Sequence, residues 1–141
     1  MPKPTILFVH GAWNAPEQYA KLTGPLREAG YEVLAPRLLS LGDQAAGKTW
    51  KDDAAMLREV VRPLFAEGRE VVVVAHSYGG VPATHAIEGL EATEGRPGGF
   101  TAVVYMTAFC LPKGVDLYQA TGRNYLKCMQ HSEPYSGVSA T

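Results

Sequence analysis

A serine at the end of an unbroken β-branched run constrains the fold of this chain most strongly. Residues 71–74 are four consecutive valines, which is typical of a strand buried on both faces of a parallel sheet. The segment 75–80, Ala-His-Ser-Tyr-Gly-Gly, follows and leads into a helix-compatible stretch. On such a sharp strand-to-helix turn the strained backbone lifts the hydroxyl of Ser77 clear of its neighbours. Tight packing there requires small residues at positions 75 and 79, and these are Ala75 and Gly79.

This motif differs at one position from the Gly-x-Ser-x-Gly pattern of a nucleophile elbow. Ala75 replaces the first glycine, and because it adds only a methyl group the packing requirement is still met. A strand followed by an ordinary glycine-rich turn gives a similar pattern. The order of the surrounding elements therefore has to decide between the two interpretations.

Buried-strand patterns alternate with helical patterns along the chain. Strands are predicted over residues 5–9, 31–35, 71–74 and 100–106. Between them, helical spacing of apolar residues predicts helices that begin near Asn14, near Thr49 and after the serine turn. Tyr19 is expected on the apolar face of the first helix, and Asp53 in the first turn of the second, where it favours the positive end of the dipole. This order specifies an α/β fold, a doubly wound, mostly parallel sheet with helices on both faces.

Length and composition fit one soluble globular domain. The chain has 141 residues, 46% of them apolar, and a net charge of −1, so no charge pattern indicates nucleic acid or a membrane. Cys110 and Cys128 are too few for a disulfide framework and lack metal-ligand spacing, and no phosphate-binding glycine loop follows any strand. The apolar run 6–9 is too short for a signal peptide or a membrane helix. We therefore expect a cytoplasmic protein that needs no metal and no cofactor.

Two motifs occur together in a characteristic order: His10-Gly11 after the first strand and residues 75–79 after the third. With Ala-Pro-Arg at 35–37 after the second strand, they make the chain resemble the α/β-hydrolase family. More narrowly, it resembles the methylesterase and hydroxynitrile-lyase-like branch, which typically opens with a strand followed by His-Gly-Ala-Trp. The resemblance covers about residues 5–118. It implies that residues 1–118 form the N-terminal portion of a C-terminally truncated hydrolase core.

The resemblance implies a serine hydrolase that acts on small carboxylic esters. Ser77 would attack the ester carbonyl, and the backbone amides of Ala12 and Tyr78 would form the oxyanion hole. Gly11 and Gly79 would allow the loop after the first strand and the helix after the third to approach the serine closely.

None of the histidines near these motifs is expected to be the general base. In the family His10 shapes the turn after the first strand, His76 is adjacent to the serine and points away from it, and His85 lies on a helix that leads away. Trp13 and Tyr78 are candidates for lining an acyl or alcohol pocket, although an aromatic side chain near a core is more often packing.

The acid and the base of a catalytic triad have no clear counterpart. In this fold the triad follows the order Ser, Asp or Glu, His, and Asp116 and His131 keep that order. The resemblance places Asp116 on the way to the lid region, and His131 falls in the segment 119–141, which we expect to be an irregular or disordered tail. A truncated, non-catalytic domain that binds a ligand or partner is therefore the alternative to an esterase. Lyase chemistry, known in the same branch, uses the same serine and is not separated by these residues.

The resemblance implies that this chain ends shortly after the equivalent of the sixth of the family's usual eight strands. The strand at 100–106 would then lie at an open edge of the sheet, with unpaired backbone groups. Self-association through this edge is therefore expected.

Overall fold

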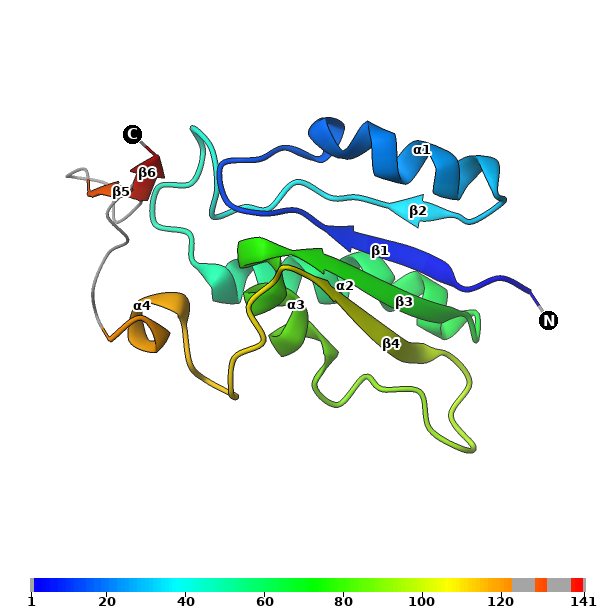
Figure 1. Ribbon diagram of the computed structural model, residues 1–141. Helices are drawn as coiled ribbons and strands as arrows, with labels where there is room; N and C mark the ends of the chain where they lie inside the picture. Colours follow the sequence, from blue (N-terminus) through cyan, green and yellow to red (C-terminus); the bar gives the residue numbers. More distant parts are fainter. Residues whose placement is uncertain (1, 123–128, 132–137, 141) are drawn as a thin grey trace.

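A four-stranded parallel sheet forms the centre of the computed structural model, which describes residues 2–122, 129–131 and 138–140, with side chains for residues 2–122 (Figure 1). The strands are β1 (Thr5–Val9), β2 (Val33–Leu34), β3 (Glu70–His76) and β4 (Gly99–Met106). Their order is β2-β1-β3-β4, and every neighbouring pair is parallel. The α/β architecture predicted from the sequence is confirmed.

Strand β1 lies between two neighbours, and all five of its residues are buried. Ile6 and Phe8 point to one face of the sheet, whereas Leu7 and Val9 point to the other, because side chains alternate along a strand. Helix α1 (Ala20–Glu28), which follows the 3-10 helix η1 (Pro16–Tyr19), covers the first face. Helices α2 (Trp50–Ala66) and α3 (Gly80–Ile87) cover the second face (Figure 1). A strand buried on both sides thus explains the continuous apolar run.

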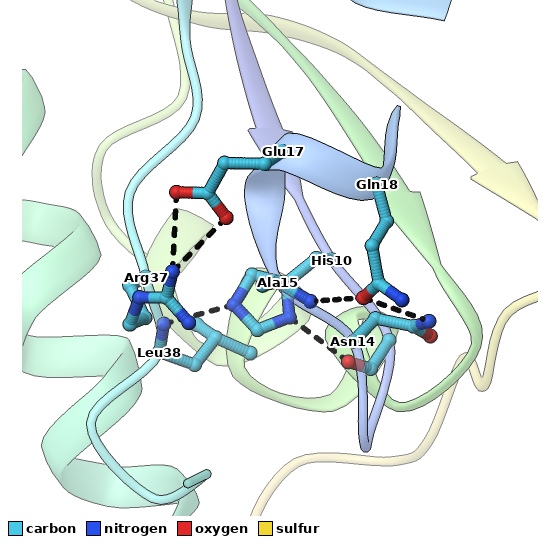
Figure 2. Close-up of polar contacts among 8 residues, drawn as sticks. His10, Asn14, Ala15, Glu17, Gln18, Arg37 and Leu38 are labelled. Carbon is cyan, nitrogen blue, oxygen red and sulfur yellow. Dashed lines mark hydrogen bonds and ion pairs between the residues drawn. The ribbon is translucent and has the colours of Figure 1, made fainter. Parts of the chain in front are cut away.

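The second helix begins where the sequence predicts. Thr49 is the N-cap of α2, its hydroxyl accepts from Lys51 N, and the Asp52 carboxylate accepts from Thr49 N at 2.8 Å. That backbone hydrogen bond is the main reason why the pKa of Asp52 is lowered. The first helical turn begins near Asn14 as predicted, but its N-cap is Ala15, whose amide donates to the Gln18 side chain at 2.6 Å (Figure 2).

The segment after β4 is more regular than expected. A short helix, α4 (Leu117–Ala120), is followed by β5 (Met129–His131) and β6 (Val138–Ala140), which pair antiparallel. The sequence predicts an irregular or disordered tail over residues 119–141, of which 123–128, 132–137 and 141 lie outside the described residues. Strands of three residues are too short to show an alternating pattern, so the sequence does not indicate β5 and β6. No helix in the described part of the chain is long and apolar enough to cross a membrane.

Strand β4 ends the sheet on one side. Val104 is 47% exposed and Tyr105 is 36% exposed, and no charged residue or proline occurs between Gly99 and Met106. Natural edge strands usually carry charges, prolines or bulges that prevent pairing with another chain. Here only a register shift opposite Val71 and Val72 interrupts the strand, near its beginning. Among the described residues, the second half of β4 is therefore an unprotected edge.

Val104→Lys is expected to reduce self-association of the protein, because a charged side chain on an edge strand opposes pairing with a second copy. Light scattering over a concentration series would report the mass of the species present. Leu39→Lys is the matched control, since Leu39 is a similarly exposed apolar residue (41%) outside the sheet. An unchanged mass distribution in Val104→Lys would reject association through β4.

Candidate active site

The turn that contains the serine, residues 76–79 (called the serine turn below), joins β3 to α3. Ser77 follows the last residue of β3 and begins the 3-10 helix η2 (Ser77–Gly79). Its φ is +51°, in the left-handed region, which costs a non-glycine residue about 1–2 kcal/mol. The Ser77 carbonyl accepts from Phe109 N at 3.1 Å, so the segment after β4 anchors the turn. The strained strand-to-helix geometry expected at this serine is present.

Two glycines bring the surrounding backbone into close contact with the serine turn. A Cβ on Gly79 would lie 2.5 Å from the carbonyl oxygen of Val9 and 2.6 Å from that of His10. A Cβ on Gly11 would lie 2.9 Å from His76 Nδ1 and 3.1 Å from Ser77 Cβ. The loop at residues 10–14 therefore packs directly against the serine turn, at a distance that side chains at positions 11 and 79 would prevent.

His10 is fixed by hydrogen bonds at both ring nitrogens (Figure 2). Leu38 N donates to Nε2 at 3.0 Å, so Nδ1 carries the proton and donates to the Gly11 carbonyl at 2.9 Å. Burial lowers the pKa of His10, although the hydrogen bond to Gly11 opposes this shift. The ring is only 1% exposed. This geometry suits a residue that shapes the 10–14 loop and leaves neither nitrogen for a substrate.

An exposed ion pair joins η1 to the segment after β2, close to the 10–14 loop. Arg37 binds both carboxylate oxygens of Glu17, at 3.0 Å and 3.1 Å, and so links η1 to the segment after β2 (Figure 2). Both side chains are largely exposed, and solvent screening leaves such a pair little net energy.

His76 contacts the 10–14 loop through Tyr19. Its Nδ1 lies 2.7 Å from the Tyr19 hydroxyl, which also accepts from Gly11 N at 3.1 Å and lies 3.2 Å from Asn14 Oδ1. Helical spacing predicts Tyr19 only as an apolar helix position. Its hydroxyl group connects segments that are far apart in sequence, which helical spacing does not indicate.

Asp53 lies in the first turn of α2, as the sequence predicts, and its side chain also has tertiary contacts that this prediction does not include. It is fully buried and accepts from Leu39 N at 2.6 Å, from Ser40 N at 2.9 Å, from Ser40 Oγ, and from the Tyr78 hydroxyl at 3.2 Å. It therefore joins α2 to the loop after β2 and to the serine turn. A signal was present, since Asp53 lies four residues before Leu57 and shares its buried helix face.

The Tyr78 side chain points into this buried cluster. Its hydroxyl lies 3.1 Å from Ser40 Oγ, and burial, with a further contribution from the nearby Asp53 carboxylate, raises the pKa of Tyr78. The hydroxyl is thus held by Ser40 and Asp53.

His85 and Asp116 have structural partners of their own. His85 Nδ1 donates to a carbonyl within α3, its Nε2 accepts from Gly114 N at 3.0 Å, and its ring lies 4.2 Å from that of Trp50. Asp116 is the N-cap of α4 and accepts from Gln119 N at 2.7 Å. These contacts give His85 a packing role at the end of α3.

The described side chains do not complete a triad. Within residues 2–122, no hydrogen bond joins the Ser77 hydroxyl to a histidine, and no group of three or more potential metal ligands is found there. His131, the remaining histidine of four, lies on β5, outside the residues whose side chains are described.

A model of the alpha/beta hydrolase family matches residues 6–137. The chain belongs to this family. Among curated proteins, it is 35% identical over 120 residues to the alpha/beta hydrolase nvfD of Aspergillus novofumigatus, which covers 83% of this chain and 48% of that protein. It is also 30% identical over 114 residues to a carbendazim hydrolyzing esterase of Nocardioides sp., with 79% of this chain and 44% of that protein covered.

This alpha/beta hydrolase chain also resembles a solved structure. Tomato methylketone synthase I in complex with 2-tridecanone superposes with a TM-score of 0.71 at 18% identity, over all of this chain and 58% of that one. A likeness at 18% identity shows that the two chains share a fold and nothing more. The chain spans about half the length of the curated relatives described above.

Proposed function

We propose that this chain carries the nucleophile and oxyanion hole of a serine hydrolase for small carboxylic esters. The left-handed backbone of Ser77 carries this proposal, because it supports a hydroxyl held clear of the sheet between β3 and α3. The adjacent 10–14 loop supplies the Ala12 amide, and the serine turn supplies the Tyr78 amide. The names of the two curated relatives, a hydrolase and an esterase, support hydrolysis as the reaction class.

The reaction would proceed through an acyl-enzyme. Ser77 Oγ forms a bond to the ester carbonyl carbon, and the electron pair of the carbonyl bond moves to its oxygen, where the two amides stabilise the charge. Collapse of this intermediate breaks the bond to the alcohol oxygen, which takes up a proton and leaves. Water then attacks the acyl group and releases the acid and free serine. The serine proton needs an acceptor, for which Asp116 and His131 are the pair in the family's order.

A non-catalytic domain that binds a ligand or partner is the second candidate function. The observation that favours it is the absence, within residues 2–122, of a hydrogen bond between the Ser77 hydroxyl and a base. A serine alcohol without a base is a poor nucleophile. The two candidates differ in one measurable property, the reactivity of Ser77.

A fluorophosphonate is expected to label the protein with one equivalent, and Ser77→Ala is expected to abolish labelling. An activated serine displaces fluoride and forms a stable phosphonyl ester, so intact mass spectrometry would measure the stoichiometry. Peptide mapping of the adduct would identify the residue. Folded wild-type protein that stays unlabelled would contradict the hydrolase proposal and favour the binding domain.

A further inference from the structure

One hydroxyl group joins the two segments that carry the proposed oxyanion amides. Tyr19, at the end of η1, places its oxygen 3.1 Å from Gly11 N in the 10–14 loop and 2.7 Å from His76 Nδ1 in the serine turn. Ala12 and Tyr78, whose amides would bind the oxyanion, are each within two residues of one of these contacts. The Tyr19 oxygen therefore links the two halves of the site.

The Tyr19 hydroxyl both accepts and donates a hydrogen bond. Gly11 N is an obligatory donor, so the Tyr19 oxygen accepts from it. The phenol has one proton to donate, with His76 Nδ1 at 2.7 Å and Asn14 Oδ1 at 3.2 Å as its partners. Every partner of this hydroxyl is thus in the 10–14 loop or the serine turn.

The ring of Tyr19 is held in place by the core. Its centroid is 4.6 Å from that of Phe8 in the buried strand β1, and 5.5 Å from that of His76. The Tyr19 carbonyl accepts from the buried Thr23 hydroxyl at 3.2 Å. The hydroxyl is therefore presented by a fixed ring, which makes it an effective anchor for a loop.

We propose that Tyr19 is a positioning residue, whose hydroxyl holds the 10–14 loop against the serine turn and so sets the spacing of the Ala12 and Tyr78 amides. This inference rests on the proposed function and deepens it. An oxyanion hole works because its donors are fixed before charge develops, so a loosened loop weakens stabilisation of the transition state. The partners of the Tyr19 hydroxyl are Gly11, Asn14 and His76, so it would act through the loop and the turn rather than on Ser77 itself.

Tyr19→Phe removes this hydroxyl and keeps the ring. Amide hydrogen exchange measured by NMR is expected to become about tenfold faster at Gly11, because its amide loses its acceptor. The rate of fluorophosphonate labelling at Ser77 is expected to fall about tenfold, which is less than the loss of a whole oxyanion donor. With an ester substrate, kcat should fall while KM changes little.

Tyr31→Phe is the matched control. Tyr31 is a half-buried tyrosine of the same apolar cluster, and within residues 2–122 the structure describes no hydrogen bond from its hydroxyl. This variant is expected to leave the Gly11 exchange rate and the labelling rate unchanged. Thermal unfolding of both variants would show that the folded state is retained.

The outcomes separate this inference from the proposed function. An unchanged exchange rate at Gly11 in Tyr19→Phe would show that the Tyr19 hydroxyl does not hold the 10–14 loop. Faster exchange with unchanged labelling would overturn the positioning role. A wild-type protein that is not labelled would overturn the hydrolase proposal and the positioning role that rests on it. The Gly11 exchange rates would still show whether the Tyr19 hydroxyl holds the 10–14 loop.

Discussion

Gly79→Ala is expected to lower the free energy of unfolding by about 3 kcal/mol, the upper end of the usual range for overpacking. The new methyl group would lie 2.5 Å from the Val9 carbonyl oxygen, and this neighbour is backbone in the centre of the sheet. Relief therefore requires that α3 and the serine turn move away from β1. Urea unfolding would measure the loss, and slower fluorophosphonate labelling of Ser77 would report the displaced turn.

Gly24→Ala is the control for this substitution. Gly24 lies inside α1, and a Cβ there would meet nothing within 4 Å. Gly79 has a helical φ of −53°, so alanine is conformationally acceptable at both positions. Gly24→Ala should stabilise the protein by about 0.5–1 kcal/mol through helix propensity. Equal effects at the two glycines would contradict the steric explanation.

Asp53→Ala is expected to cost about 3 kcal/mol of unfolding free energy, because several buried donors lose their acceptor at once. This carboxylate accepts hydrogen bonds from Leu39 N, Ser40 N, the Ser40 hydroxyl and the Tyr78 hydroxyl. Chemical denaturation would measure the loss, and labelling of Ser77 should also slow, since Tyr78 is the next residue.

The neighbouring acid provides a matched comparison. Asp52 lies in the same helical turn, but its partly exposed carboxylate accepts from Thr49 and pairs with the exposed Lys48 ammonium at 3.9 Å. Asp52→Ala should therefore cost much less than Asp53→Ala. If the two substitutions destabilise the protein equally, the buried network would not have the role inferred from its geometry.

The sheet was predictable because a parallel strand buried on both faces has a strong local signal. Residues 5–9 match β1 at both ends, and the run at 71–74 gives the centre of β3. The strand extends to His76 because residues 75 and 76 also pair with a neighbour, which apolar runs do not reveal. Conversely, only Val33 and Leu34 pair with β1, so β2 is shorter than its apolar pattern.

Parts of the candidate site were predictable for the same reason. The turn at Ser77 and its small neighbours form a contiguous motif, and the required backbone conformation restricts the residue types locally. Tyr19 and Asp53 were missed because their polar contacts cross 57 and 25 residues of sequence. A tyrosine at a helical apolar position and an acid in a first turn already have sufficient local explanations. No local pattern therefore indicates the contacts of Tyr19, whereas the buried helix face that Asp53 shares with Leu57 is the one signal for its burial.

The left-handed conformation of Ser77 also sets stability and chemistry in opposition at a single position. Glycine adopts this conformation without the steric cost borne by a side chain, whereas only a hydroxyl-bearing residue supplies the proposed nucleophile. Selection of variants for thermal resistance alone would therefore favour the loss of the reactive group. Engineering of a more robust form should instead begin at positions remote from this turn, such as Gly24 within α1.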